Sequence, residues 1–167
     1  MATPEIITVL QHTTLAGWMR GEVAGGEWAF PIVETIHVIS LATLFGSIAM
    51  VDLRLLGFAS CDSLVSRLSH EVLPWTWIAF VVAAMTGSLM FISRAGTYWQ
   101  NPQTQAKFLC MLLAGLNMMV FHFGVYRRVA DWDVAVKTPP AARFAGAASL
   151  LLWASVIFFG RWIGFTT

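Results

Sequence analysis

An acidic side chain and a histidine lie three residues apart within a long apolar run of the sequence. Glu34 and His37 fall between Trp28 and Val51, and residues three apart share one face of a helix. A carboxylate in that position can fix the tautomer of the imidazole and raise its basicity, as it does for metal-bound histidines. Because ionisable groups are costly inside a membrane, the pair predicts a functional site. The alternative is that Glu34 reaches the membrane surface and His37 bonds to a neighbouring backbone group.

Three other histidines have different surroundings. His122 follows Met118 by one helical turn in an apolar run, and we expect it inside the membrane near the cytoplasmic end. His70 precedes another apolar run, where a histidine at the membrane surface without a ligand is the alternative. His12 lies on a polar face near the N-terminus and needs no functional explanation.

These histidines predict haem b, because histidines on facing helices of a bundle hold that cofactor by axial coordination. The candidate haem-binding residues are His37, His122, His70 and Glu34. His37 lies about five residues outward of the middle of its apolar run and His122 about six inward, a separation of roughly 15 to 20 Å along the membrane normal. Unless the helices tilt steeply, we expect His122 to pair with His70, and His37 with His12 or a non-histidine ligand.

Soft ligands make copper the alternative cofactor. The chain has eight methionines and two cysteines, which suit Cu(I). Met118 is close in sequence to His122, so His37, His122 and Met118 are the candidate metal ligands. Methionine is also an ordinary filler of apolar interfaces, and the sequence has neither a Met-x-x-Met nor a Cys-x-x-Cys spacing.

The composition places these residues in a membrane protein. Of the 167 residues, 57% are hydrophobic and 11% are charged, and the mean hydropathy is +0.70. A soluble domain carries about a quarter charged residues, so this chain has too little polar surface for a water-soluble globule. Its net charge of +1 excludes a nucleic-acid-binding protein that works by neutralising phosphates.

Four segments are long and apolar enough to cross about 30 Å of hydrocarbon, which takes roughly 20 helical residues. They cover residues 28–51, 75–92, 108–126 and 144–163. We therefore predict an all-α fold, an integral membrane four-helix bundle with a short N-terminal interfacial helix, in a single domain over residues 1–167. The interfacial helix covers residues 3–19, with a floppy tail as the alternative, and residues 60–72 predict a second amphipathic helix. The N-terminus lacks the pattern of a cleaved signal peptide, so we expect it to be retained.

The basic residues favour one orientation of these spans. Six Lys and Arg residues lie on the side of the first and third connecting loops, against four on the side of the termini. Because cytoplasmic loops carry the excess of basic residues, we expect both termini on the outer, periplasmic side.

Several motifs resemble those of a bacterial four-span membrane protein family without an established activity. The motifs are Trp28-Ala-Phe-Pro-Ile-Val-Glu-Thr-Ile-His37, Val51-Asp-Leu-Arg-Leu-Leu-Gly57 and the run from Asn117 through His122 to Arg128. The chain is similar, more distantly, to the copper-resistance D (CopD) membrane domain. The resemblance implies a four-span fold in the bacterial inner membrane, and its motif positions include Glu34, His37, Asp52, Arg54 and His122.

Together these patterns favour a haem-b-binding membrane subunit that passes electrons between a periplasmic partner and the quinone pool, rather than a stand-alone enzyme. One alternative is a copper-handling, CopD-like membrane protein. The other is a structural subunit that anchors a larger membrane complex, in which the histidines only pack. The expected partners are the lipid bilayer, a periplasmic redox or copper-binding protein, a quinone, and either a larger membrane complex or further copies of the chain.

Overall fold

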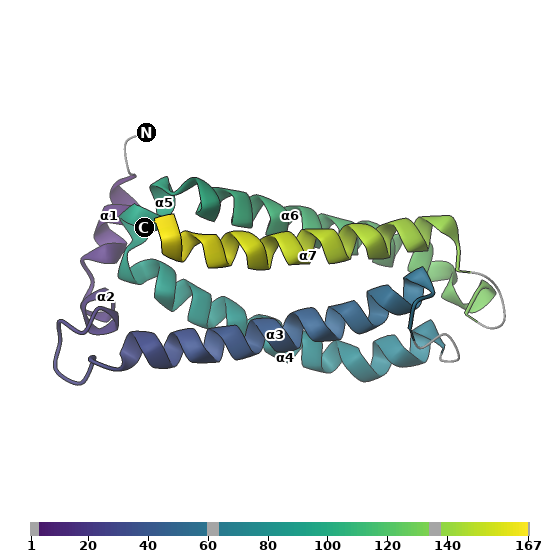
Figure 1. Ribbon diagram of the computed structural model, residues 1–167, viewed down its shortest axis with the longest axis horizontal. Coiled ribbons are helices and arrows are strands. Elements are labelled where there is room, and N and C mark those ends of the chain that lie inside the picture. The colour runs from purple at the N-terminus through teal and green to yellow at the C-terminus, as the bar shows by residue number, and fades with distance from the viewer. Residues whose placement is uncertain (1–3, 60–63, 134–137, 167) are drawn as a thin grey trace.

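The computed structural model describes residues 4–59, 64–133 and 138–166, and these residues form helices and no strand. Its four long helices are α3 (Ala29–Leu56), α4 (Val65–Ser93), α6 (Pro102–Phe123) and α7 (Pro140–Thr166). Its short elements are the α-helices α1 (Glu5–Gln11), α2 (Thr14–Met19) and α5 (Ala95–Gln100), and the 3-10 helix η1 (Val125–Asp131). We name the end with α1, α2, α5 and both chain ends the termini end, and the opposite end the loop end (Figure 1). The predicted all-α bundle is confirmed.

Two antiparallel hairpins build the bundle. α3 packs along α4, and α6 packs along α7. The hairpins meet where α3 packs against α7, and these two helices diverge toward the termini end (Figure 1). α3 therefore contacts both halves of the bundle.

The long helices fit a lipid bilayer. The four apolar helical segments are 27 to 30 residues long, more than the roughly 20 residues that cross the hydrocarbon. Their outward faces carry large apolar side chains that are more than half exposed, among them Ile32, Trp75, Leu112 and Leu151. Four such helices indicate a multi-pass membrane protein.

The second long helix begins earlier than the sequence predicts. Residues 65–72, expected to belong to a separate amphipathic helix, form the first turns of α4, and residues 60–63 lie outside the described residues. Pro74 lies inside α4, where its ring removes one backbone donor but does not end the helix. The reason for the early start lies in a distant part of the chain.

Asp133 caps the first turn of α4 from the far side of the sequence. Its Oδ1 accepts hydrogen bonds from the backbone N–H groups of Val65, at 2.6 Å, and Ser66, at 3.3 Å. Its Oδ2 accepts one from the Ser66 hydroxyl. Leu64, at the N-cap position, has no side-chain bond to the helix. The Asp133 carboxylate therefore satisfies donors that a helix start leaves unpaired.

Arg20 fastens the N-terminal helices to the bundle. Its guanidinium donates to the backbone carbonyls of Gln11, at 2.9 Å, and Ser93, the last residue of α4, at 2.8 Å. It also forms an ion pair with Glu22, at 2.7 Å. The single interfacial helix predicted over residues 3–19 is instead two short helices, because Thr13 caps α2 by accepting from the N–H of Ala16.

Replacing Asp133 by alanine will leave the buried N–H of Val65 and the partly buried N–H of Ser66 without this partner. We expect Asp133→Ala to lower the free energy of unfolding by about 1 to 3 kcal/mol, measured by denaturant titration in detergent micelles. Asp131→Ala is the matched control, because Asp131 is an exposed acid in the same loop. Equal losses in the two variants would contradict the capping role.

Acid will loosen the attachment of α2. The hydrogen bond from Arg20 holds the pKa of Glu22 below its usual value, which is near 4.3 for a free glutamate. A lowered folded pKa means that the stabilisation is complete above that usual value and is lost as the pH falls through the folded one. We expect hydrogen exchange in α2, corrected for intrinsic rates, to rise below about pH 4. Glu22→Gln should abolish this pH-dependent step; an unchanged step would assign it to another group.

Candidate cofactor site at the termini end

His37 is held against α4 by a hydrogen bond between its ring and Thr86. Its Nδ1 lies 2.9 Å from Oγ1 of Thr86. The Thr86 hydroxyl also lies 2.7 Å from the carbonyl of Val82 and 3.2 Å from that of Ala83. When it donates its one hydrogen to either carbonyl, it accepts from Nδ1 of His37. In that arrangement Nδ1 carries the proton of the neutral imidazole, and Nε2 keeps a lone pair that is available to a ligand or metal.

Gly87 gives the imidazole its place on the surface of α4. A Cβ atom at residue 87 would lie 2.9 Å from Cε1 and 3.7 Å from Nε2 of His37. Carbon atoms do not approach that closely without a shift, so any larger residue would displace the ring. The absence of a side chain at Gly87 is thus part of the site.

Lys107 brings a positive charge to the same region from the other hairpin. Its stem lies against Gly160 of α7, where a Cβ would come within 3.4 Å of Nζ. The next residue, Phe108, contacts Phe91 of α4 with ring centroids 6.0 Å apart, one helical turn from Gly87. Among the described residues, ion pairs join Arg20 to Glu22 and Arg67 to Glu71, and none involves Lys107. The region therefore contains an imidazole that can offer Nε2 to a ligand and a lysine that has no acidic partner among the described residues.

No described hydrogen bond joins Glu34 to His37. The carboxylate is exposed on α3, and the side chain that is hydrogen-bonded to the imidazole is Thr86. Glu34 acts on Tyr98 of α5: burial raises the pKa of Tyr98, Arg94 opposes that shift, and Glu34 adds to it. The three-residue spacing thus places the two side chains near one face of α3 without joining them.

His122, Met118 and His70 lie at the loop end, away from His37. His122 is near the end of α6, where it is exposed and stacks on Tyr126 with ring centroids 5.4 Å apart. Met118 is 50% exposed, and His70 is exposed near the start of α4. No described contact joins His70 to His122. Within the described residues, no group of three or more His, Cys, Asp or Glu side chains is placed to hold one metal ion.

A second polar feature lies where α3 meets α7. The Asp52 side chain is 6% exposed, its Oδ2 has no hydrogen-bond partner, and the carboxylate is hydrogen-bonded to Ser149. A Cβ at Gly146 would lie only 3.2 Å from the Asp52 carbonyl oxygen, so the two helices approach closely here. Asp52 is therefore an interior residue of the bundle and does not reach the lipid headgroups.

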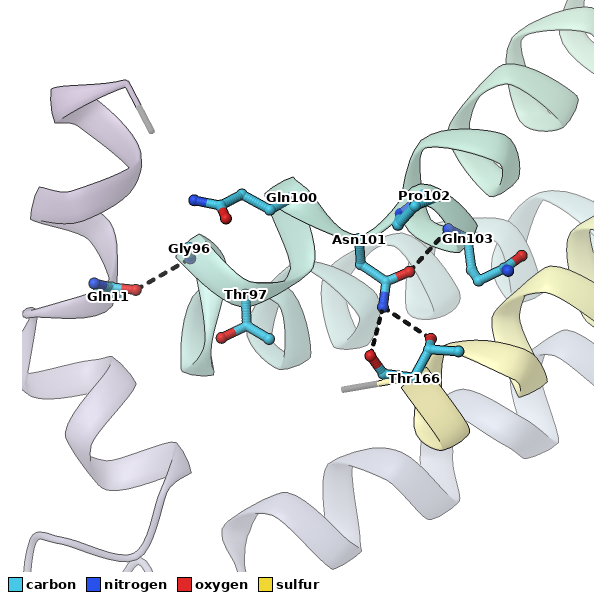
Figure 2. Close-up of a pocket in the computed structure, with 8 residues that line it drawn as sticks. All are labelled: Gln11, Gly96, Thr97, Gln100, Asn101, Pro102, Gln103 and Thr166. Carbon is cyan, nitrogen blue, oxygen red and sulfur yellow. Dashed lines mark hydrogen bonds between the residues drawn. The ribbon is translucent and has the colours of Figure 1, made fainter. Parts of the chain in front are cut away.

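An open, uncharged hollow of about 650 Å³ lies on the termini end (Figure 2). It is lined by amides, hydroxyls and backbone from α1, α5, α6 and α7: Gln11, Gly96, Thr97, Gln100, Asn101, Pro102, Gln103 and Thr166. Gln11 accepts a hydrogen bond from the N–H of Gly96 at 3.1 Å. Asn101 donates to the Thr166 hydroxyl at 2.9 Å. These bonds tie the ends of the helices together, so we assign the hollow a structural role.

Sequence reasoning missed Lys107 as a member of the site. In the sequence, Lys107 contributes only to the expected membrane orientation. A lysine about one and a half turns into an apolar helix is, however, itself a signal for an interior site. The hydrogen bond between Thr86 and His37 and the contact of the ring with Gly87 could not be predicted, because both depend on how α3 and α4 pack.

Comparison with known proteins places nearly the whole chain in one family. A protein-family model described as "Family of unknown function (DUF6644)" matches residues 10–166, a range that includes His37, Thr86 and Lys107. No curated protein and no solved structure matches the chain. Nothing in these findings ties it to the copper-resistance D domain.

Two glycine substitutions should have opposite effects on stability. Alanine favours a helix over glycine by up to about 1 kcal/mol, and a Cβ at Gly46 would meet nothing within 4 Å, so Gly46→Ala should raise the free energy of unfolding. Gly87→Ala should lower it, because the new Cβ displaces His37 and breaks a hydrogen bond that contributes about 1 kcal/mol. Denaturant titration in micelles compares the two; equal stabilisation would show that His37 does not rest on Gly87.

Proposed function

The chain belongs to DUF6644, a family of unknown function, and we propose that it is a membrane subunit that binds haem b through His37. In this proposal it passes electrons between a periplasmic partner and the quinone pool of a bacterial inner membrane. The observation that supports the proposal best is the hydrogen bond from His37 to Thr86, because it leaves Nε2 as the coordinating atom.

The neighbouring residues suit a haem group in two further respects. A hydrogen bond to the other ring nitrogen orients the axial histidine of a metal site and tunes its basicity, and Thr86 is placed to do this for His37. A haem propionate carries a negative charge, and a charge-assisted hydrogen bond from an ammonium would stabilise it. Lys107 supplies that ammonium from the opposite hairpin.

The position of His37 in the bundle is compatible with electron transfer to or from a partner on the outer side of the membrane. His37 lies near the termini end of α3, which begins at Ala29, and the distribution of basic residues favours the periplasmic side for the termini. A periplasmic partner could therefore approach the cofactor without crossing the bilayer. The orientation is part of the proposal.

His122 and His70 lie at the loop end. His12 follows α1 at the termini end, where it is exposed and has no described contact with His37. We therefore propose that the sixth position of the iron is open or weakly filled. Such iron binds carbon monoxide when reduced, whereas iron with two histidine ligands does so poorly. Carbon monoxide binding thus distinguishes this site from a bis-histidine cytochrome.

The absorption spectrum of the detergent-purified protein tests the proposal. We expect a Soret band in wild-type protein made with ample haem, and a shift of that band when carbon monoxide is added to the dithionite-reduced sample. His37→Ala should remove the band. His122→Ala, the matched control on an exposed histidine, should keep it.

The other outcomes are informative as well. A featureless spectrum from wild-type protein would refute haem binding. Loss of the band in His122→Ala but not in His37→Ala would place the ligand at the loop end. Lys107→Met should keep the band but weaken haem retention on washing, because it removes the counter-charge for the propionate.

A further inference from the structure

Two arginines flank the point where α6 ends and the chain turns. α6 ends at Phe123, and Gly124 follows with φ −99° and ψ −92°. A Cβ at Gly124 would lie 2.7 Å from the carbonyl oxygen of Val120, a distance that only glycine permits. This turn leads directly into η1, which carries Arg127 and Arg128.

The turn leaves a hollow beside these arginines. It measures about 660 Å³ and is lined by Phe123, Gly124, Val125, Arg127 and Arg128. Both arginines are exposed. The hollow is therefore an open recess at the loop end with two guanidinium groups on its wall.

The charges of these two arginines are not neutralised within the described chain. The ion pairs of the described residues are Arg20–Glu22 and Arg67–Glu71. Asp131, in the same 3-10 helix, pairs with neither arginine. Two planar guanidinium groups are well suited to phosphate oxygens, which they bind with paired hydrogen bonds.

The recess continues into a surface that faces lipid. On α6, Leu116 is 55% exposed, and Val120 and Phe123 are each 65% exposed. α6 is also the long helix with the smallest buried share, 6% of its apolar window. A molecule in the recess would thus have a cationic wall at one end and an apolar wall beside it.

We propose that Arg127 and Arg128, with the outward face of α6, form a binding site for an anionic phospholipid. The phosphate group lies against the two guanidinium groups, and the acyl chains lie along Leu116, Val120 and Phe123. Basic recesses at the cytoplasmic ends of membrane helices recognise anionic headgroups in this way. The site is separate from His37, which lies at the termini end.

Native mass spectrometry of the detergent-purified protein tests this site with dioleoyl phosphatidylglycerol, and with dioleoyl phosphatidylcholine as the zwitterionic control. We expect the wild type to bind phosphatidylglycerol more tightly than phosphatidylcholine. The double variant Arg127→Gln/Arg128→Gln should bind phosphatidylglycerol about thirtyfold more weakly, since each basic residue at an anionic surface contributes roughly a factor of five. It should still fold, because both side chains are exposed.

Arg67→Gln is the matched control. Arg67 is an exposed arginine of α4 that is already paired with Glu71, so its loss should leave phosphatidylglycerol binding near the wild-type value. Equal weakening in Arg67→Gln and the double variant would overturn the proposal in favour of general charge attraction. Unchanged binding in the double variant would also overturn it. So would competition by millimolar inorganic phosphate, because a lipid held by its acyl chains is not displaced by the ion alone.

Discussion

The contact between α3 and α7 holds the two halves of the bundle together. Other contacts join the halves near their ends, such as the bonds from Asp133 to the start of α4 and the contact of Phe91 with Phe108, but α3 and α7 form the longest contact between the hairpins. The helices approach closely at Gly146, where a Cβ would lie 3.2 Å from the carbonyl oxygen of Asp52 and 3.3 Å from the Cβ of Leu55, so a side chain there would push them slightly apart. Because His37 belongs to one hairpin and Lys107 to the other, the relative position of the lone pair and the ammonium depends on this close approach.

The second requirement is that the backbone groups at the helix ends find hydrogen-bond partners, since such groups cannot stay unpaired in hydrocarbon. The chain meets it with side chains from remote segments. Asp133 accepts hydrogen bonds from backbone N–H groups at the start of α4. At the other end of α4, Arg20 donates a hydrogen bond to the carbonyl of Ser93. The start of α6 is served locally by Asn101, whose side chain accepts from the N–H of Gln103 at 2.8 Å.

The sequence was sufficient for those features that depend on local composition. Four apolar segments predicted four long helices, and their polar ends explain why the observed helices extend beyond the predicted spans. It was not sufficient where a distant residue determines the local structure. The start of α4, for example, depends on Asp133, which lies 68 residues beyond Val65. The candidate site shows the same division. His37 could be recognised from its setting, whereas its contact with Thr86 and the approach of Lys107 arise only when separate helices pack.

The hydrogen bonds between distant segments at the termini end have a consequence for the order of folding during biosynthesis. Gln11 needs Gly96 as its partner, and Arg20 needs the carbonyl of Ser93, so α1 and α2 cannot settle until two long helices have been made. Asn101 in turn bonds to Thr166 at the end of α7. The segments synthesised first therefore reach their final positions late. The hydrogen bonds of the termini end are complete only after the fourth long helix, α7, has left the ribosome.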